Sequence, residues 1–217
     1  MVIAGAQGFE SVSTVLCLGA HSDDIEIGCG GTLLKLRRIN PRLNVKFIVF
    51  SGDDSRAGEA RRSVQALTGN GNGVELVVHS FRDGYFPYEG ARIKDYFNEL
   101  ADTVRPDLIF THYRQDLHQD HRLVSDLTWN TFRDHLILEY EIPKYDGDIG
   151  SPNVFVHLDQ CTCEQKIDQL HRSFSSQAGK PWFSRETFLS TLRLRGIESR
   201  SPDGYAEAFY GRKLVLA

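Results

Sequence analysis

The sequence has few cysteines and no familiar spacing among them. It contains four in 217 residues, and none forms the Cys-x-x-Cys pair of a zinc knuckle or a dithiol redox site. Cys161 and Cys163 are separated by one residue, which is too tight for a usual zinc knuckle. Cys17 lies in an apolar segment, where a small buried side chain is expected. The sequence therefore predicts that the chemistry lies in other residues.

The sequence also lacks a long apolar run and an excess of positive charge. No apolar run approaches the roughly 20 residues that a membrane-spanning helix needs. The first eight residues lack the basic start and sustained apolar core of a signal peptide. A net charge of −4 offers no basic surface to nucleic acid or to an anionic membrane. We therefore expect a cytoplasmic protein with reduced cysteines, no membrane span and no nucleic-acid partner.

Short β-rich runs alternate with helical patterns along the chain. Strands are expected over residues 15–19, 44–51, 74–80, 107–112, 136–142, 154–158 and, at the last edge, 213–217. Helices are expected over residues 30–38, 57–68, 93–104, 120–132, 164–174 and 185–194. This alternation predicts a Rossmann-like α/β fold, with a mostly parallel sheet and helices on both of its faces. Because there is no linker, repeat or low-complexity tract, residues 1–217 are expected to form a single domain.

A histidine and two acidic residues directly follow the first predicted strand. Ligands of parallel sheets bind at the carboxyl ends of the strands, which is where His21, Asp23 and Asp24 are expected. A histidine and a carboxylate three residues apart can bind one metal ion if the loop turns tightly. The other carboxylate could then take a proton from metal-bound water. The alternative is that one of the aspartates only caps the helix that follows.

The glycines after this segment suggest a nucleotide loop only weakly. Residues 28–31 read Gly-Cys-Gly-Gly, which lacks the six-residue dinucleotide spacing. Thr32 and Leu33 stand where a P-loop would need Lys followed by Ser or Thr. A nucleotide-binding module therefore stays only as an alternative.

Histidines and aspartates gather again after the predicted strand 107–112. Five of them lie within ten residues, in a chain with eight histidines in total: His112, Asp116, His118, Asp120 and His121. If a helix starts near Asp120, the rings of His118 and His121 approach one another. The alternative is that Asp120 caps this helix and the histidines are solvated. Because both clusters are expected at the same edge of one sheet, we favour a split metal site.

Both clusters resemble the signatures of the PIG-L/LmbE-like family of zinc de-N-acylases. Residues 20–26 read AHSDDIE, which resembles the family's Ala-His-Pro-Asp-Asp-x-Glu, and residues 118–121 read HQDH, which matches its His-x-Asp-His. Ser22 replaces the usual proline, which changes loop stiffness but no ligand. Residues 56–60, 176–177 and 205–209 also agree, so the resemblance spans most of the chain.

The resemblance implies a role for each residue of the two motifs. His21, Asp24 and His121 would bind Zn²⁺, with Fe²⁺ as an alternative divalent ion. Asp23 would be the general base and His118 the electrophile or general acid. Family members hydrolyse N-acetyl groups on glucosamine-containing compounds, so the expected partner is a small amino-sugar conjugate. Beside this, Asp120 is expected to hold His118 charged and oriented.

Two further features have a functional and a structural interpretation each. Arg56 could bind a substrate hydroxyl or phosphate, or form an ion pair with Glu59. The aromatic segment 81–88 could form a sugar-stacking wall or simply cover the core, and its position after a strand favours the wall. For Trp182 and Phe183, packing or a subunit contact is expected instead. A homo-oligomer is compatible with the sequence.

The sequence thus predicts a zinc-dependent hydrolase that removes an N-acyl group, the acetyl group above all, from an amino-sugar conjugate. One alternative is a metal-dependent amidase or deformylase that acts on another amide. A second is a catalytically silent module that binds a metal or a nucleotide. Such a module would be expected to lack Asp23 or a ligand, and all of these residues are present.

Overall fold

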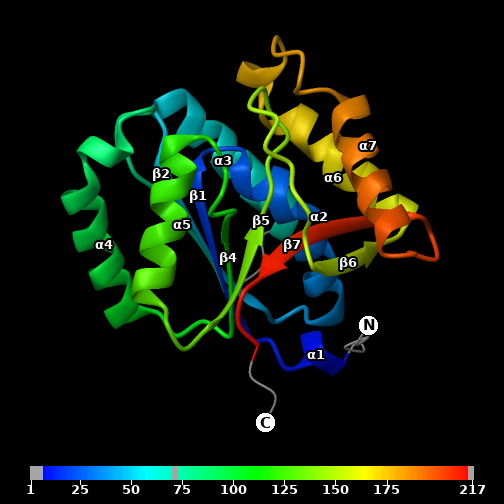
Figure 1. Ribbon diagram of the computed structural model, residues 1–217, viewed down its shortest axis with the longest axis horizontal. Coiled ribbons are helices and arrows are strands. Elements are labelled where there is room, and N and C mark those ends of the chain that lie inside the picture. Colours follow the sequence, from blue (N-terminus) through cyan, green and yellow to red (C-terminus); the bar gives the residue numbers. More distant parts are fainter. Residues whose placement is uncertain (1–6, 70–72, 215–217) are drawn as a thin grey trace.

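The strands belong to one sheet, whose middle is parallel. The structure is a computed structural model that describes residues 7–69 and 73–214. Among these, seven strands pair in the order β3-β2-β1-β4-β5-β7-β6 (Figure 1). Their bounds are β1 Thr14–His21, β2 Asn44–Ser51, β3 Val74–Val78, β4 Leu108–His112, β5 Leu136–Tyr140, β6 Val154–Leu158 and β7 Tyr205–Gly211. Strands β1 to β5 run parallel and β7 is antiparallel to both of its neighbours, which confirms the predicted mostly parallel sheet.

Helices cover both faces of the sheet, as predicted. They are α1 Gln7–Glu10, α2 Asp24–Ile39, α3 Asp54–Thr68, α4 Gly90–Thr103, α5 Gln119–Thr131, α6 Gln160–Ser173 and α7 Arg185–Glu198. Short 3₁₀ turns lie at Phe86–Tyr88 and Ser175–Gln177. Helices α4 and α5 lie on one face, and α2, α3, α6 and α7 lie on the other (Figure 1). None of the helices in the described parts of the chain is long and apolar enough to cross a bilayer.

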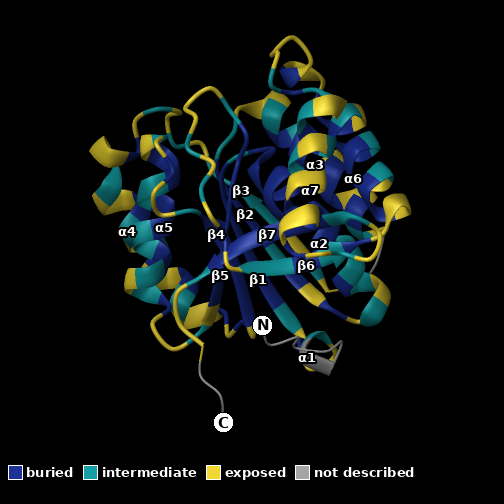
Figure 2. Cartoon of the chain, turned by 45° about the vertical axis from the view of Figure 1, so that its right-hand side comes forward, coloured by how far each residue is buried: buried dark blue, intermediate teal, exposed yellow. Residues whose placement is uncertain are grey.

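Strand β1 shows why a central strand of this fold is apolar throughout. Leu16 and Leu18 face the core under α4 and α5, whereas Val15 and Cys17 face the core on the other side. Because both faces of a parallel sheet are covered, no position of such a strand can be polar without a partner. Figure 2 shows the same contrast, with buried strands between helices whose outer faces are exposed.

Helix α2 begins at Asp24, six residues earlier than expected. The glycine-rich residues 28–31 do not delay the helix, because they allow it to approach the sheet closely. A Cβ atom at Gly28 would lie 2.2 Å from the ring of Tyr140, and one at Gly31 would lie 2.5 Å from Leu158. These glycines therefore serve helix packing.

The prediction of an edge strand over residues 213–217 is wrong for the two of these residues that the structure describes. Lys213 and Leu214 form no strand, and residues 215–217 lie outside the described part of the chain. The last strand is β7, which lies inside the sheet between β5 and β6. Its central Glu207 is buried, which contradicts the usual apolar pattern of an interior strand.

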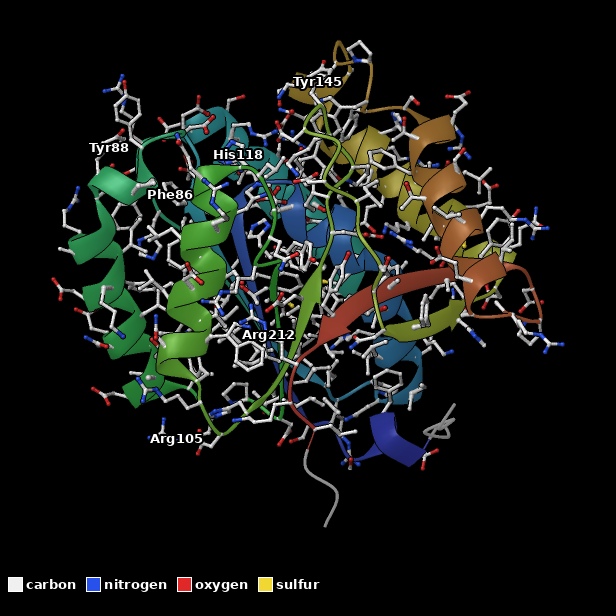
Figure 3. All side chains as sticks on the ribbon, viewed as in Figure 1. Phe86, Tyr88, Arg105, His118, Tyr145 and Arg212 are labelled. Carbon is white, nitrogen blue, oxygen red and sulfur yellow. The ribbon has the colours of Figure 1, made fainter. Side chains whose placement is uncertain are left out.

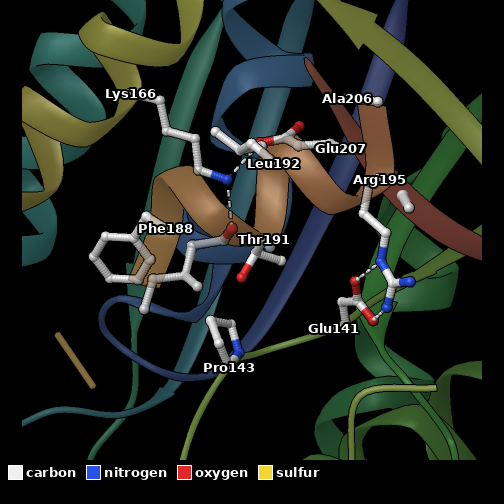
Figure 4. A pocket seen from close by; sticks show the side chains of 12 residues that line it. Glu141, Pro143, Lys166, Phe188, Thr191, Leu192, Arg195, Ala206 and Glu207 are labelled. Atoms are coloured by element: carbon white, nitrogen blue, oxygen red, sulfur yellow. Dashed lines mark hydrogen bonds and ion pairs between the residues drawn. The ribbon is translucent and has the colours of Figure 1, made fainter. Parts of the chain in front are cut away.

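Buried ion pairs explain that carboxylate and tie the outer helices to the sheet. Glu207 accepts hydrogen bonds from the backbone of Gly31 and Thr32 on α2, and from Lys166 Nζ on α6 at 2.6 Å. Arg195 on α7 binds both carboxylate oxygens of Glu141 at 2.7 and 2.8 Å. Figure 4 shows the two pairs on either side of a cavity of about 20 Å³. The second pair fixes the start of the loop that follows β5.

We predict that Glu207→Gln lowers the free energy of unfolding by about 3 kcal/mol, because it leaves the buried ammonium of Lys166 without a counter-charge. Urea denaturation measures this. Asp168→Asn is the control, since that carboxylate on α6 pairs with Arg185 at the exposed surface and its loss should change little. A loss for Glu207→Gln no larger than for the control would contradict the interpretation.

Candidate active site and metal centre

The residues of both sequence motifs come together at the carboxyl edge of the sheet. His21 ends β1 and His112 ends β4, and the loops after β2, β3, β4 and β5 rise around them. His118 precedes α5, and Tyr145 lies in the loop after β5, at the same edge of the molecule (Figure 3). A pocket of about 770 Å³ opens here, with His21, Asp23, Asp24, His118 and His121 among its lining residues.

Three donor atoms from the two motifs converge at the base of this pocket. His21 Nδ1 lies 3.3 Å from Asp24 Oδ2 and 3.2 Å from His121 Nε2, and the last two atoms are 3.6 Å apart. In a tetrahedral zinc site with bonds of roughly 2.0–2.1 Å, ligand atoms are about 3.3 Å apart. The three residues therefore fit a zinc ion with one coordination position left open.

The local backbone explains why these side chains point inward. The side chain of Asp24, in the first turn of α2, accepts a hydrogen bond from the backbone N–H of His21 at 2.6 Å. Asp23 occupies the N-cap position, but its side chain makes no capping hydrogen bond. The capping alternative is therefore wrong for Asp23, and its carboxylate faces the pocket.

Carboxylates hold the far side of each histidine ring. Asp116 Oδ2 lies 2.9 Å from His121 Nδ1, and Asp83 Oδ1 lies 3.0 Å from His21 Nε2. Metal-binding histidines commonly donate their second N–H to such a carboxylate, which fixes the ring and its tautomer. Lys144 Nζ lies 3.0 Å from Asp116, so that carboxylate is itself held in place.

The electrostatics of the three donors suit a cation. Burial raises the pKa of Asp24, but His121, His112 and His21 together lower it well below its usual value, so the carboxylate is ionised. Burial and the nearby His112 lower the pKa of His121 to about 4, which leaves a neutral ring able to donate a lone pair. Burial lowers the pKa of His21, but the neighbouring carboxylates, led by Asp24, raise it well above its usual value. A bound cation would take the place of that proton.

Arg56 forms the ion pair with Glu59 that was its structural alternative, and it also lines the pocket. Its Nη1 lies 3.1 Å from Glu59 Oε2, and its Nη2 donates to Asp23 Oδ1 at 2.7 Å. Arg56 lies in the first turn of α3, where its backbone N–H donates to the side chain of the N-cap residue Asp53. Burial raises the pKa of Asp23, and the charge of Arg56 opposes that rise. The guanidinium therefore orients the carboxylate that the sequence assigned as the base.

His118 is held at the N-terminus of α5, above the donor atoms. Its Nδ1 accepts the backbone N–H of Asp120 at 3.3 Å, and its ring lies 5.0 Å from that of His21 and 4.5 Å from that of His121. Burial, together with the nearby charge of His21, lowers its pKa. With Nδ1 occupied as an acceptor, the second ring nitrogen is the one that carries the proton.

The carboxylate of Asp120 makes different contacts from those expected. It accepts the backbone N–H groups of Gly84 and Phe86 at 2.6 and 3.1 Å, and it lies 3.5 Å from His21 Nε2. Asp120 was expected to hold His118 charged and oriented: its charge opposes the lowering of the pKa of His118 by burial, but a hydrogen bond to that ring is not among its contacts with the described residues. Nor does Asp120 cap the helix, because the N-cap residue of α5 is His118.

The aromatic segment 81–88 is partly a packed cover and partly a pocket wall. Phe86 is completely buried, and Tyr88 is 81% exposed and points to solvent (Figure 3). Phe81 and Asp83 line the pocket, as does Trp182 on the loop before α7. The sequence predicts packing or a subunit contact for Trp182, and the structure adds a place on the wall of the pocket.

Three residues near the donors carried little or no sequence signal. Asp83 is a single acid in an aromatic loop, and Lys144 lies in a loop without a motif. Both reach the centre only through the tertiary fold. His112 belonged to the histidine cluster and to a strand end but had no assigned role. In the structure none of its side-chain surface is exposed, and its Nε2 lies 3.2 Å from Asp24 Oδ2.

Comparison with known families agrees with this geometry. Residues 16–132, more than half of the chain, match the model of the GlcNAc-PI de-N-acetylase (PIG-L) family. The chain belongs to this family. Among curated relatives, the uncharacterized deacetylase YaiS of Escherichia coli K12 is 28% identical over 146 residues, which cover 59% of this chain and 74% of YaiS. The chain is therefore a deacetylase of the PIG-L family.

Solved structures share the fold at low sequence identity. N,N'-diacetylchitobiose deacetylase from Pyrococcus horikoshii superimposes with a TM-score of 0.71 and 20% identity, covering 95% of this chain and 86% of that one. GalB, a 4-carboxy-2-hydroxymuconate hydratase from Pseudomonas putida, superimposes with a TM-score of 0.68 and 14% identity, covering 94% and 98%. Since the same fold is found in a deacetylase and a hydratase, residues of the site have to distinguish the reactions.

We predict that Asp120→Ala speeds hydrogen exchange of the Phe86 amide about ten- to hundredfold, because a hydrogen bond to a charged acceptor is lost. Hydrogen exchange followed by NMR measures this, with amides of β1 as the internal reference for global stability. Asp126→Ala is the control, since that carboxylate lies on the same helix and pairs with Arg114 at the surface. Equal exchange in the two variants would contradict the assigned contact.

Proposed function

We propose that the protein is a zinc-dependent hydrolase that removes the N-acetyl group of an amino-sugar conjugate. The observation that carries this proposal is the triangle of donor atoms from His21, Asp24 and His121, with edges of 3.2–3.6 Å, at the base of an open pocket. A zinc ion held there supplies a Lewis acid, which lowers the pKa of water to about 7 and polarises a carbonyl group.

The residues around the triangle have the positions that amide hydrolysis requires. Asp23 accepts the proton of the attacking water, because its carboxylate faces the pocket and Arg56 fixes one of its oxygens at 2.7 Å. Burial raises its pKa, which makes it a stronger base than an exposed aspartate. His118 presents its N–H to the substrate, where it would stabilise the developing oxyanion as a hydrogen-bond donor, and the proton that Asp23 takes from the water would pass to the departing amine.

The pocket is larger than one sugar ring needs, which supports a conjugate as the substrate. Its volume of about 770 Å³ lies in the range of sites that bind drug-sized molecules. Tyr145, which is 71% exposed, and Trp182 lie on its wall and offer flat surfaces on which a ring can stack. The family description names GlcNAc-PI, and the chitobiose enzyme acts on an acetylated sugar, which supports the N-acetyl amino sugar.

The assignment of Asp23 predicts a separation between metal binding and turnover. Asp23→Asn should bind zinc at the wild-type stoichiometry and lose about 10²–10⁴-fold in kcat, because only the proton acceptor is removed. His121→Ala should lose both, because one of three ligands is missing. Elemental analysis of the purified variants and turnover of N-acetylglucosamine conjugates measure the two properties. A zinc-free Asp23→Asn protein would overturn the assigned roles.

The same assay tests the substrate class. Formyl and peptide amides, offered beside N-acetylglucosamine conjugates, distinguish the proposed enzyme from a general amidase or a deformylase. If zinc is bound but no amino sugar is turned over, the metal assignment stands and the substrate assignment falls. Replacement of zinc by iron(II) in the same assay shows which ion supports the faster reaction.

We also predict that Trp182→Ala raises KM for an N-acetylglucosamine conjugate by about tenfold, since loss of a stacking surface costs about 1–1.5 kcal/mol. If Trp182 stacks on the second group of the conjugate and not on the reacting amide, kcat should change little. N-Acetylglucosamine itself is the control substrate, since it lacks the second group, and its kcat/KM should be nearly unaffected. An equal effect on both substrates would place Trp182 against the sugar that is deacetylated.

A further inference from the structure

His112 lies directly behind the three donor atoms and contacts several parts of the site at once. Its Nε2 accepts the backbone N–H of Ala20 at 2.9 Å and lies 3.2 Å from Asp24 Oδ2. The hydroxyl of Tyr140 lies 3.3 Å from the same nitrogen. Its ring stacks on that of His121, with centroids 3.9 Å apart and planes at 19°. One fully buried ring therefore contacts two of the three proposed ligands.

The hydrogen bond to Ala20 takes the place of a regular sheet contact. The backbone pairing of β1 with β4 ends at Cys17 and Phe110, whereas β1 stays paired with β2 as far as His21. Beyond that point the two central strands separate, and the ring of His112 accepts the N–H that β4 no longer binds. The ring thus fixes the backbone directly before His21.

In this position one ring nitrogen of His112 has no hydrogen-bond partner among the described residues. Because the N–H of Ala20 donates to Nε2, the neutral imidazole carries its proton on Nδ1. That nitrogen is buried and has no hydrogen-bond partner among the described residues. A buried polar group without a partner costs about 1–3 kcal/mol, and an apolar side chain in the same space would avoid the cost. A stabilising role in the core therefore does not explain a histidine at this position.

We propose that His112 is a positioning residue of the metal centre, which holds the donor atoms of His21, Asp24 and His121 in register. It fixes the backbone at His21 through Ala20, and with it the His21 amide that the Asp24 carboxylate accepts, and it sets the plane of the His121 ring by stacking. It is not itself a fourth ligand, because its Nε2 is committed to the Ala20 amide. This inference rests on the proposed function, since it takes those three residues as the ligands.

The test is the zinc affinity of two apolar variants, measured by competition with a chelator. His112→Phe keeps a stacked ring without nitrogen, and His112→Met fills the space with a flexible side chain that adapts to it. Each is expected to raise the Kd for zinc about ten- to hundredfold, as loss of residues that orient metal ligands does. His112→Gln, whose amide oxygen can accept the Ala20 N–H, should recover most of the affinity.

His171→Phe is the matched control, because that histidine also has a ring nitrogen without a partner in the described chain but packs against Phe183 and Phe188. It should leave the Kd for zinc unchanged. Thermal unfolding of the metal-free variants is measured in parallel, because a purely structural role would lower Tm and leave the affinity of the folded protein unaltered. Either apolar variant, if folded, overturns the inference by binding zinc within threefold of wild type.

The outcomes also separate this inference from the proposed function. If wild-type protein binds zinc and deacetylates amino sugars while either apolar variant keeps its affinity, only the role of His112 falls. If wild-type protein binds no zinc at all, the metal centre falls and the role of His112 falls with it.

Discussion

The Asp24 carboxylate meets three histidine rings and a backbone amide where β1 ends, and the geometry of the site depends on that meeting. Such a buried charge is tolerated only because neighbouring groups, the backbone N–H and the ring of His21 among them, offset part of the lost hydration. Its place in the first turn of α2 adds the favourable end of the helix dipole. The close approach of α2 to the sheet in turn needs Gly28 against the ring of Tyr140. The geometry of the site thus depends on the packing of α2 against the sheet.

The position of the site could be predicted from the sequence because it depends on strand ends. Two motifs that each follow a strand of a parallel sheet must meet at one edge, whatever the details of the loops. The residues that contact the proposed metal ligands and their carboxylate partners from the surrounding loops were harder to predict. Asp83 contacts His21 from one loop and Lys144 contacts Asp116 from another, and no local pattern marks such contacts.

The errors in secondary structure have a common physical cause. Residues 24–29 were not expected to be helical. Glycine weakens a helix, but here it permits the contact with the sheet that stabilises α2. Strand β7 was not expected, and the buried Glu207 interrupts its apolar pattern. In both places a tertiary contact outweighs the local preference. The partner that decides the outcome lies far away in the sequence. Tyr140 is 112 positions from Gly28, and Lys166 is 41 positions from Glu207.

The contacts of Asp120 link the wall of the pocket to its base. One carboxylate holds the amides of Gly84 and Phe86 and also faces the ring of His21. Two elements that share a charged group cannot rearrange independently, and their coupling is reciprocal. If an ordered segment 81–88 stabilises the observed position of His21, then a fixed His21 stabilises the ordered segment by the same free energy. The order of the pocket wall and the order of its base therefore depend on each other through Asp120.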